Sequence, residues 1–212
     1  MKNQVIKALN RRYATKNFDS SKKVTDNDLE IILEAARLTA SSFWLQPYEI
    51  LVIKNQATRE KLRHASYGQS QITEASHLIV LATRTDINDN LVEKYIENIS
   101  MTRNMPLENL ESFSEMIKNS LKHLDDEWKI KRAQKQTYIV LGNMLTTLAL
   151  LEIDATPMEG FAVKEYDEIL NLKEKNLTAT LVLPVWFRSQ QDPYISLKKV
   201  RKTPNEIIKF ID

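Results

Sequence analysis

The sequence predicts one globular domain, residues 1–212, of the α/β or α+β class, because helical and strand patterns alternate along the chain. Three short apolar runs rich in β-branched residues have the composition of buried strands: YEILVIK (48–54), HLIVLATR (77–84) and TATLVLPVWF (178–187). Helical patterns separate them, and no internal repeat, low-complexity tract or Gly/Ser linker divides the chain. A hydrophobic fraction of 42% supports a real core.

The clearest helix begins after Thr25, a plausible N-cap. Leu29, Ile32, Leu33 and Ala36 follow with the i, i+3, i+4, i+7 spacing of one helix face. Shorter helical patterns occupy residues 3–13, 57–66 and 166–172. The highly charged segment 106–136, with spaced apolar residues, suits a helical excursion that faces solvent.

Residues 137–154 (TYIVLGNMLTTLALLEID) form a second kind of helix, apolar nearly all round. The segment is too short to span a bilayer, so we expect it to be covered on every side, in part by a second subunit.

Composition excludes several classes of protein. Thirty Lys and Arg against 28 Asp and Glu leave a net charge of +2, so no overall basic field indicates nucleic acid. The absence of cysteine removes disulfides, thiolate metal sites and a thiol nucleophile. No signal-peptide core and no apolar run of about 18 residues occurs, and we expect a cytoplasmic protein without a membrane contact. The three histidines lack a ligand spacing, so no metal site is expected.

Basic residues gather near both ends of the chain: Arg11, Arg12, Lys16, Lys22 and Lys23, then Lys198, Lys199, Arg201 and Lys202. If the termini meet, these residues form a phosphate pocket. If they do not, the two runs are solvated tails, which is the commoner fate of charged runs.

The familiar catalytic and nucleotide motifs are absent. Neither G-x-G-x-x-G nor a P-loop occurs in a chain with three glycines. Ser41 and Ser42 lack a G-x-S-x-G elbow, so by pattern they cap a helix-to-loop junction before Gln46–Pro47.

One of the three glycines, Gly160, follows Glu159 in TPMEGF (156–161). This stretch is either an ordinary exposed turn or a backbone that offers consecutive N–H groups to a ligand, with the glycine allowing close approach. Pattern alone leaves both open.

Six ordered stretches together resemble the FMN-dependent nitroreductase family, closest to its oxygen-insensitive NAD(P)H nitroreductase and dihydropteridine reductase branch. They cover nearly the whole chain and are RRYATKNFD (11–19), SSFWLQPYEI (41–50), EASHLIVLATR (74–84), YIVLGNML (138–145), PMEGF (157–161) and LKKVRKTPNE (197–206). The resemblance implies an α+β three-layer fold, with a central mixed, mainly antiparallel sheet flanked by helices. It also implies an intertwined homodimer with FMN bound between the chains.

The resemblance also implies roles for individual residues. Arg12, Lys199 and Arg201 would hold the flavin phosphate, while Tyr13, Ala14 and Lys16 would line the ribityl chain and ring. A Lys16 cation at the pyrimidine edge would favour transfer of two electrons together. Gln71 would face the flavin with Gly68 nearby, and Ser41, Ser42 and Trp44 would reach the flavin of the partner subunit.

For the turn, the resemblance implies that Pro157, Met158, Glu159 and Gly160 lie against the flavin ring, with a backbone N–H directed at its N5 atom and the Glu159 side chain over the substrate pocket. Glu159 and Lys16 are the expected catalytic residues. The implied reaction uses NADH or NADPH to reduce nitroaromatics, quinones or related small acceptors in ping-pong fashion.

Departures from the family pattern leave other functions open. Ala14 stands where serine is frequent, and Trp44 where Asn or Gly is common. An indole that blocks the acceptor site would suit a non-catalytic flavin-binding protein. Dihydropteridine reduction and dehalogenation are alternatives within the family, and a nucleic-acid-binding role for the basic ends is disfavoured by the balanced charge. Phe113 is a candidate aromatic lid.

Overall fold

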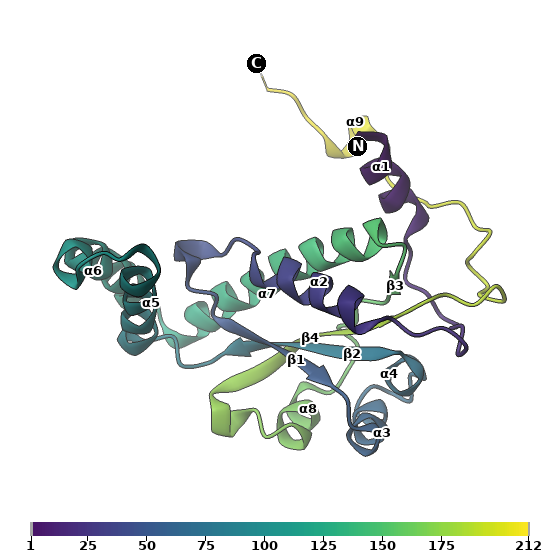
Figure 1. The fold of residues 1–212 in the computed structure, drawn as a ribbon, viewed down its shortest axis with the longest axis horizontal. Coiled ribbons are helices and arrows are strands. Elements are labelled where there is room, and N and C mark those ends of the chain that lie inside the picture. Colours follow the sequence, from purple (N-terminus) through teal and green to yellow (C-terminus); the bar gives the residue numbers. More distant parts are fainter. Residues whose placement is uncertain (1, 212) are drawn as a thin grey trace.

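A computed structural model describes residues 2–211, which form three layers with a β-sheet in the middle (Figure 1). The sheet has the strand order β1-β2-β4-β3, and each neighbouring pair is antiparallel. One isolated parallel bridge adds Ala14 beside Ala155. The strands are β1 (Tyr48–Ile53), β2 (His77–Arg84), β3 (Asp154–Ala155) and β4 (Leu177–Trp186). The predicted α+β fold with a mainly antiparallel sheet is therefore confirmed.

Helices cover both faces of this sheet (Figure 1). On one face lie α2 (Asp26–Arg37) and α7 (Asp126–Leu150), and on the other α3 (Gln56–His64), α4 (Gln71–Glu74) and α8 (Val163–Ile169). A lobe at one end holds α5 (Asp89–Arg103) and α6 (Glu111–Lys122). Near the termini lie α1 (Lys2–Arg11) and α9 (Pro204–Ile207). Short 3-10 turns are η1 (Ser42–Trp44), η2 (Leu107–Leu110) and η3 (Lys173–Lys175).

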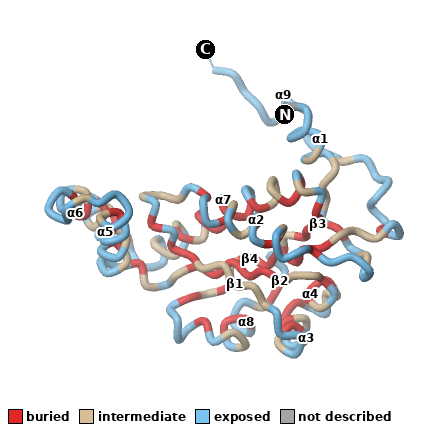
Figure 2. The backbone as a smooth tube through the Cα atoms, in the orientation of Figure 1, coloured by how far each residue is buried: buried red, intermediate tan, exposed pale blue. Residues whose placement is uncertain are grey.

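The side chains of β2 alternate between two cores, because successive residues of a strand point to opposite faces. Ile79 and Leu81 pack with residues of α2 and α7, whereas Leu78 and Val80 pack on the side of α3 and α8. All four are fully buried, and Figure 2 shows the same concentration of burial along the central strands. A one-residue slip would place each set of side chains in the core that is packed for the other.

Most predicted elements are confirmed within a few residues. Thr25 caps α2 by accepting a 3.1 Å hydrogen bond from the Asp28 N–H, as expected. Helix α5 was not predicted, although its buried residues Val92, Ile96 and Ile99 follow a helical spacing. Segment 106–136 is helical as predicted, but it is not simply solvent-facing, because Ile117 lies fully buried in a third apolar cluster.

The long helix α7 begins at Asp126, where the Asp125 carboxylate accepts from the Trp128 N–H. One of its faces is buried by the chain, but Tyr138, Ile139 and Leu150 remain 45%, 49% and 49% exposed. Within the single chain only one face of this helix packs on the sheet and α2, so the expectation that a second subunit covers the other face stays a prediction. Among residues 2–211, no helix combines the length and apolar character of a membrane span.

Candidate functional site

The two basic ends of the chain meet beside α1. The Lys199 ammonium donates to the Leu9 carbonyl at 2.6 Å and also to the Arg12 carbonyl. The interpretation as two separate solvated tails is therefore wrong. A cavity of about 690 Å³ lies between the ends, and its walls include Arg12, Tyr13, Ala14, Lys16, Arg188, Lys199 and Arg201. Ala14 and five other residues that were predicted to bind the cofactor thus line one cavity, and its volume is within the range of small-molecule sites.

The cations of this cavity repel one another. Burial lowers the pKa of Arg12, and the nearby Arg201 lowers it further. The pKa of Lys199 is lowered by burial and then by Arg12, Arg201 and Arg188. An anion placed among these groups would relieve the repulsion, and guanidinium and ammonium donors match phosphate oxygens. The residues present therefore fit the phosphate of FMN.

A buried ion pair fixes Arg188, one of the cations that line the cavity. Asp154, which is 2% exposed, accepts hydrogen bonds from the Arg188 backbone N–H at 3.0 Å and from its Nε at 2.9 Å. The Arg188 guanidinium also stacks over the Tyr13 ring, 4.4 Å from the ring centre. Neither residue of the pair was predicted as part of the site, because 34 positions of sequence separate them. Removing one partner of such a pair leaves a buried charge uncompensated.

Asp192 holds the segment that carries Lys16. Its Oδ2 accepts from the backbone N–H groups of Lys16 and Asn17 at 2.7 and 2.8 Å, and its Oδ1 accepts from Tyr194 at 2.9 Å. Burial alone would raise the pKa of Asp192, but these hydrogen bonds outweigh it and the pKa is lowered. The Lys16 side chain itself remains exposed. Burial and then the neighbouring Asp192 raise the pKa of Tyr13 to about 12.

The TPMEGF turn is tied to the segment 14–16, from which Ala14 and Lys16 line the cavity. The Thr156 hydroxyl donates to the Thr15 carbonyl at 2.7 Å, next to the parallel bridge between Ala14 and Ala155. Met158 is 5% exposed and exchanges two backbone hydrogen bonds with Val182, of 2.8 and 3.0 Å. The turn is therefore anchored to β4 on one side and to the Lys16 segment on the other.

Beyond this anchor the backbone is open. Glu159 and Gly160 are exposed, Pro157 is half-buried, and within residues 2–211 neither Glu159 nor Gly160 donates a hydrogen bond through its backbone N–H. A Cβ added to Gly160 would meet only the Gln69 amide at 3.8 Å, an ordinary contact distance. Nothing in the chain itself demands a glycine here, so the small residue matters only if a ligand approaches this backbone.

Gln69 supports this turn from the facing loop. Its amide donates to the Gly160 carbonyl at 3.0 Å and to the Ser66 carbonyl at 3.1 Å. Gln71, the residue expected to face the flavin, begins α4 and is 8% exposed. Gly68 lies in the loop between α3 and α4, and its φ of +75° is a backbone conformation that favours glycine. Gln69 was not among the predicted site residues, because no sequence pattern distinguishes it from its neighbours.

The carboxylate of Glu159 lies near α7. Burial raises the pKa of the Tyr138 hydroxyl, and the proximity of Glu159 raises it further. The turn and the exposed face of α7 are therefore neighbours.

The segment carrying Ser41, Ser42 and Trp44 is fastened to α7 instead. The Ser42 N–H donates to Gln136 Oε1 at 2.8 Å, and the Ser42 hydroxyl accepts from Arg132 at 2.7 Å. Within the described chain no hydrogen bond joins this segment to the basic cavity or to the 156–160 turn. The expectation that it reaches a partner's flavin stays a prediction.

Trp44 is presented by a strained loop. Phe43, Trp44 and Gln46 have φ of +54°, +58° and +43°, and the Trp44 indole is 62% exposed. Left-handed φ values at non-glycine residues cost energy and cluster at functional sites. Phe113 of α6 lies beside the indole, with 6.4 Å between ring centres.

No cluster of potential metal ligands occurs in the part of the chain that the structure describes.

Comparison with known proteins agrees with this fold. The sequence model of the nitroreductase family matches residues 9–185, so this chain belongs to the nitroreductase family. YfkO of Bacillus subtilis, named as a candidate NAD(P)H nitroreductase, is 40% identical over 185 residues, with 82% of this chain and 81% of that protein covered. A candidate NAD(P)H nitroreductase of Staphylococcus saprophyticus is 32% identical over 100% of this chain and 99% of its own.

Solved structures show the same fold. A nitroreductase-type protein of Bacillus subtilis, ydfN, superposes with a TM-score of 0.88 at 18% identity and full coverage of both chains. A nitroreductase-type protein of Exiguobacterium sibiricum, solved in complex with FMN, gives a TM-score of 0.83 at 18% identity, over 99% of this chain and 96% of that one.

Proposed function

We propose that this protein is an FMN-dependent oxidoreductase that takes electrons from NADH or NADPH and reduces nitroaromatics, quinones or related acceptors. The observation that carries the proposal is a cavity of mutually repelling cations whose lining segment 14–16 is hydrogen-bonded to a turn with two free backbone N–H groups. The relatives named for NAD(P)H nitroreduction and the FMN complex of the E. sibiricum protein support it.

The basic cavity and the TPMEGF turn each have a role in this proposal. Arg12, Lys199 and Arg201 hold the phosphate, and Lys16 supplies positive charge beside the ring. The backbone of Glu159 and Gly160 donates to the ring edge, and the Glu159 side chain borders the substrate pocket. FMN held by these residues would supply the hydride-transfer chemistry between the nicotinamide and the acceptor, so the chain needs no nucleophile of its own.

A homodimer completes the site in this proposal. The uncovered face of α7 carries Tyr138 and Ile139, both apolar and about half exposed, as a surface that a second copy would bury. The Ser41–Trp44 segment would then reach the flavin held by the other chain.

The absorption spectrum of the purified protein tests the proposal. We expect a yellow protein that bleaches without oxygen when NADH or NADPH is added, and the two rates give the reductant preference. A colourless protein that FMN does not reconstitute would overturn the proposal.

The exposed Trp44 indole favours one alternative, a flavin-binding protein without turnover. Steady reduction of a quinone by NAD(P)H would exclude it, and a panel of nitroaromatic, quinone, pteridine and halogenated acceptors would separate the reactions within the family.

A further inference from the structure

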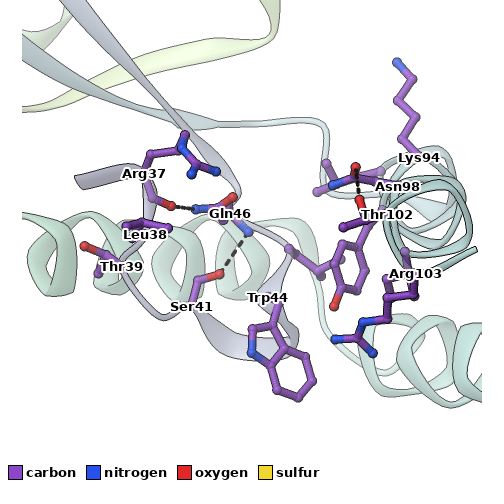
Figure 3. Close-up of a pocket in the computed structure, with 14 residues that line it drawn as sticks. Arg37, Leu38, Thr39, Ser41, Trp44, Gln46, Lys94, Asn98, Thr102 and Arg103 are labelled. Atoms are coloured by element: carbon purple, nitrogen blue, oxygen red, sulfur yellow. Dashed lines mark hydrogen bonds between the residues drawn. The ribbon is translucent and has the colours of Figure 1, made fainter. Parts of the chain in front are cut away.

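A second cavity, of about 460 Å³, is bordered by the end of α2, by η1 and by α5 (Figure 3). It shares no lining residue with the basic cavity at the joined termini. Its volume is within the range of small-molecule sites.

The charges of this cavity are all positive. Arg37, Lys94 and Arg103 line it, and none of its other lining residues is acidic. The Glu34 carboxylate neutralises Arg37 through two hydrogen bonds of 2.7 Å. In the part of the chain that the structure describes, Lys94 and Arg103 form no ion pair. Arg103 lies in the last turn of α5, where it offsets the negative end of the helix dipole, but Lys94 lies in the first half of that helix and is surplus to that role.

The remaining walls suit a planar ring and a sugar. The exposed Trp44 indole and the Tyr95 ring are aromatic, whereas Ser41, Asn98 and Thr102 offer hydrogen-bonding groups. In Figure 3, Trp44 and Arg103 lie in the lower part of the view, and Arg37 and Lys94 lie in the upper part. The strained loop is held in place, because the Gln46 backbone donates to Ser41 Oγ at 3.0 Å and its amide donates to the Arg37 carbonyl at 2.7 Å. The indole is thus pre-positioned for stacking.

We propose that this cavity binds the adenosine phosphate half of the reducing nicotinamide nucleotide, an inference that rests on the proposed function. Quinones and most nitroaromatics carry no negative charge, so the nucleotide is the substrate that an all-cationic cavity selects. Adenine stacks on Trp44, and the phosphates accept from Arg103 and Lys94. Ser41 and Trp44, expected to border the partner's flavin, also line this cavity, so the nicotinamide and adenosine ends occupy adjoining spaces.

The test compares the double variant Lys94→Gln/Arg103→Gln with the control Lys61→Gln/Lys175→Gln, which removes two exposed positive charges from α3 and η3. Calorimetric titration of the FMN-loaded protein with ADP and with adenosine 2′,5′-bisphosphate measures the site without turnover. We expect the affinity of the first variant to fall about tenfold or more, since each lost charge-assisted bond is worth roughly a factor of ten. The control should bind both probes as the parent does.

Kinetics supply the second readout. For the first variant, kcat/KM for NADH and NADPH should fall by the same factor as probe affinity, whereas kcat/KM for reduced nicotinamide mononucleotide, which lacks the adenosine phosphate, should stay within about twofold. Equal ADP affinity in parent and variant, or equal losses with NADH and the mononucleotide, would overturn the inference. Either result, in a protein that still reduces quinones, would overturn this inference and leave the proposed function intact. A colourless, flavin-free protein would overturn the proposed function itself. A larger loss for the bisphosphate than for ADP would place the 2′-phosphate at these cations.

Discussion

Replacing Gly160 by alanine separates the needs of the fold from those of the ligand. The added Cβ would lie 3.8 Å from the Gln69 amide, and φ at Gly160 is outside the left-handed range. The chain therefore accommodates the methyl group without a clash. We expect the free energy of unfolding of the flavin-free protein to change by no more than about 0.5 kcal/mol, or to rise by up to about 1 kcal/mol through loss of unfolded-state freedom.

Flavin affinity should respond quite differently. If the ring lies against this backbone, the methyl group overpacks the contact and costs about 1–3 kcal/mol, which is roughly a 5- to 150-fold weaker Kd for FMN. Gly160→Val should cost more. Urea unfolding of the flavin-free protein measures the first quantity, and titration of FMN fluorescence measures the second.

Two companion variants sharpen the result. Gly68→Ala should destabilise the flavin-free protein by about 1 kcal/mol or more, because φ there is +75°. Glu159→Gln should leave FMN bound and alter turnover. If Gly160→Ala leaves both stability and FMN affinity unchanged, the flavin does not approach this turn and the assigned role of residues 157–160 is wrong.

Three further outcomes test the site and the fold. Asp192→Asn should lower the free energy of unfolding at pH 7 by about 1.5–3 kcal/mol, because it weakens the hydrogen bonds that the carboxylate accepts. The pKa of Asp192 in the folded state is below the unfolded value of about 3.9, so the unfolded state binds more protons, and the difference between parent and variant should disappear as the pH falls below that value and through the folded-state pKa. A loss of stability in urea titrations that does not depend on pH would contradict this role. Arg201→Gln should weaken FMN about tenfold and reduce the salt dependence of its Kd, whereas an unchanged Kd would exclude a phosphate contact. Thr25→Ala should cost about 1 kcal/mol by thermal unfolding with FMN affinity unchanged, and a cost near zero would show that the cap contributes nothing.

The strands and several helices could be predicted from the sequence because their signals are local. The β-branched runs became β1, β2 and β4, and Thr25 caps α2, since composition and spacing within a few residues decide these elements. The mainly antiparallel sheet was available only through the resemblance to the nitroreductase family. The weaker pattern of α5 was passed over, although Val92, Ile96 and Ile99 carry it.

The site depends on contacts between distant parts of the chain, which no local pattern encodes. Asp192 bonds the Lys16 backbone 176 positions away, and Lys199 bonds Leu9 across 190. The same basic residues could lie in two solvated tails or around one cavity. The composition is identical in both cases, so only the tertiary structure decided between these alternatives. The same holds for Gly160: the sequence marked a rare glycine after a glutamate, and folding placed it on an open backbone beside Gln69, where only a bound ligand would require its missing side chain.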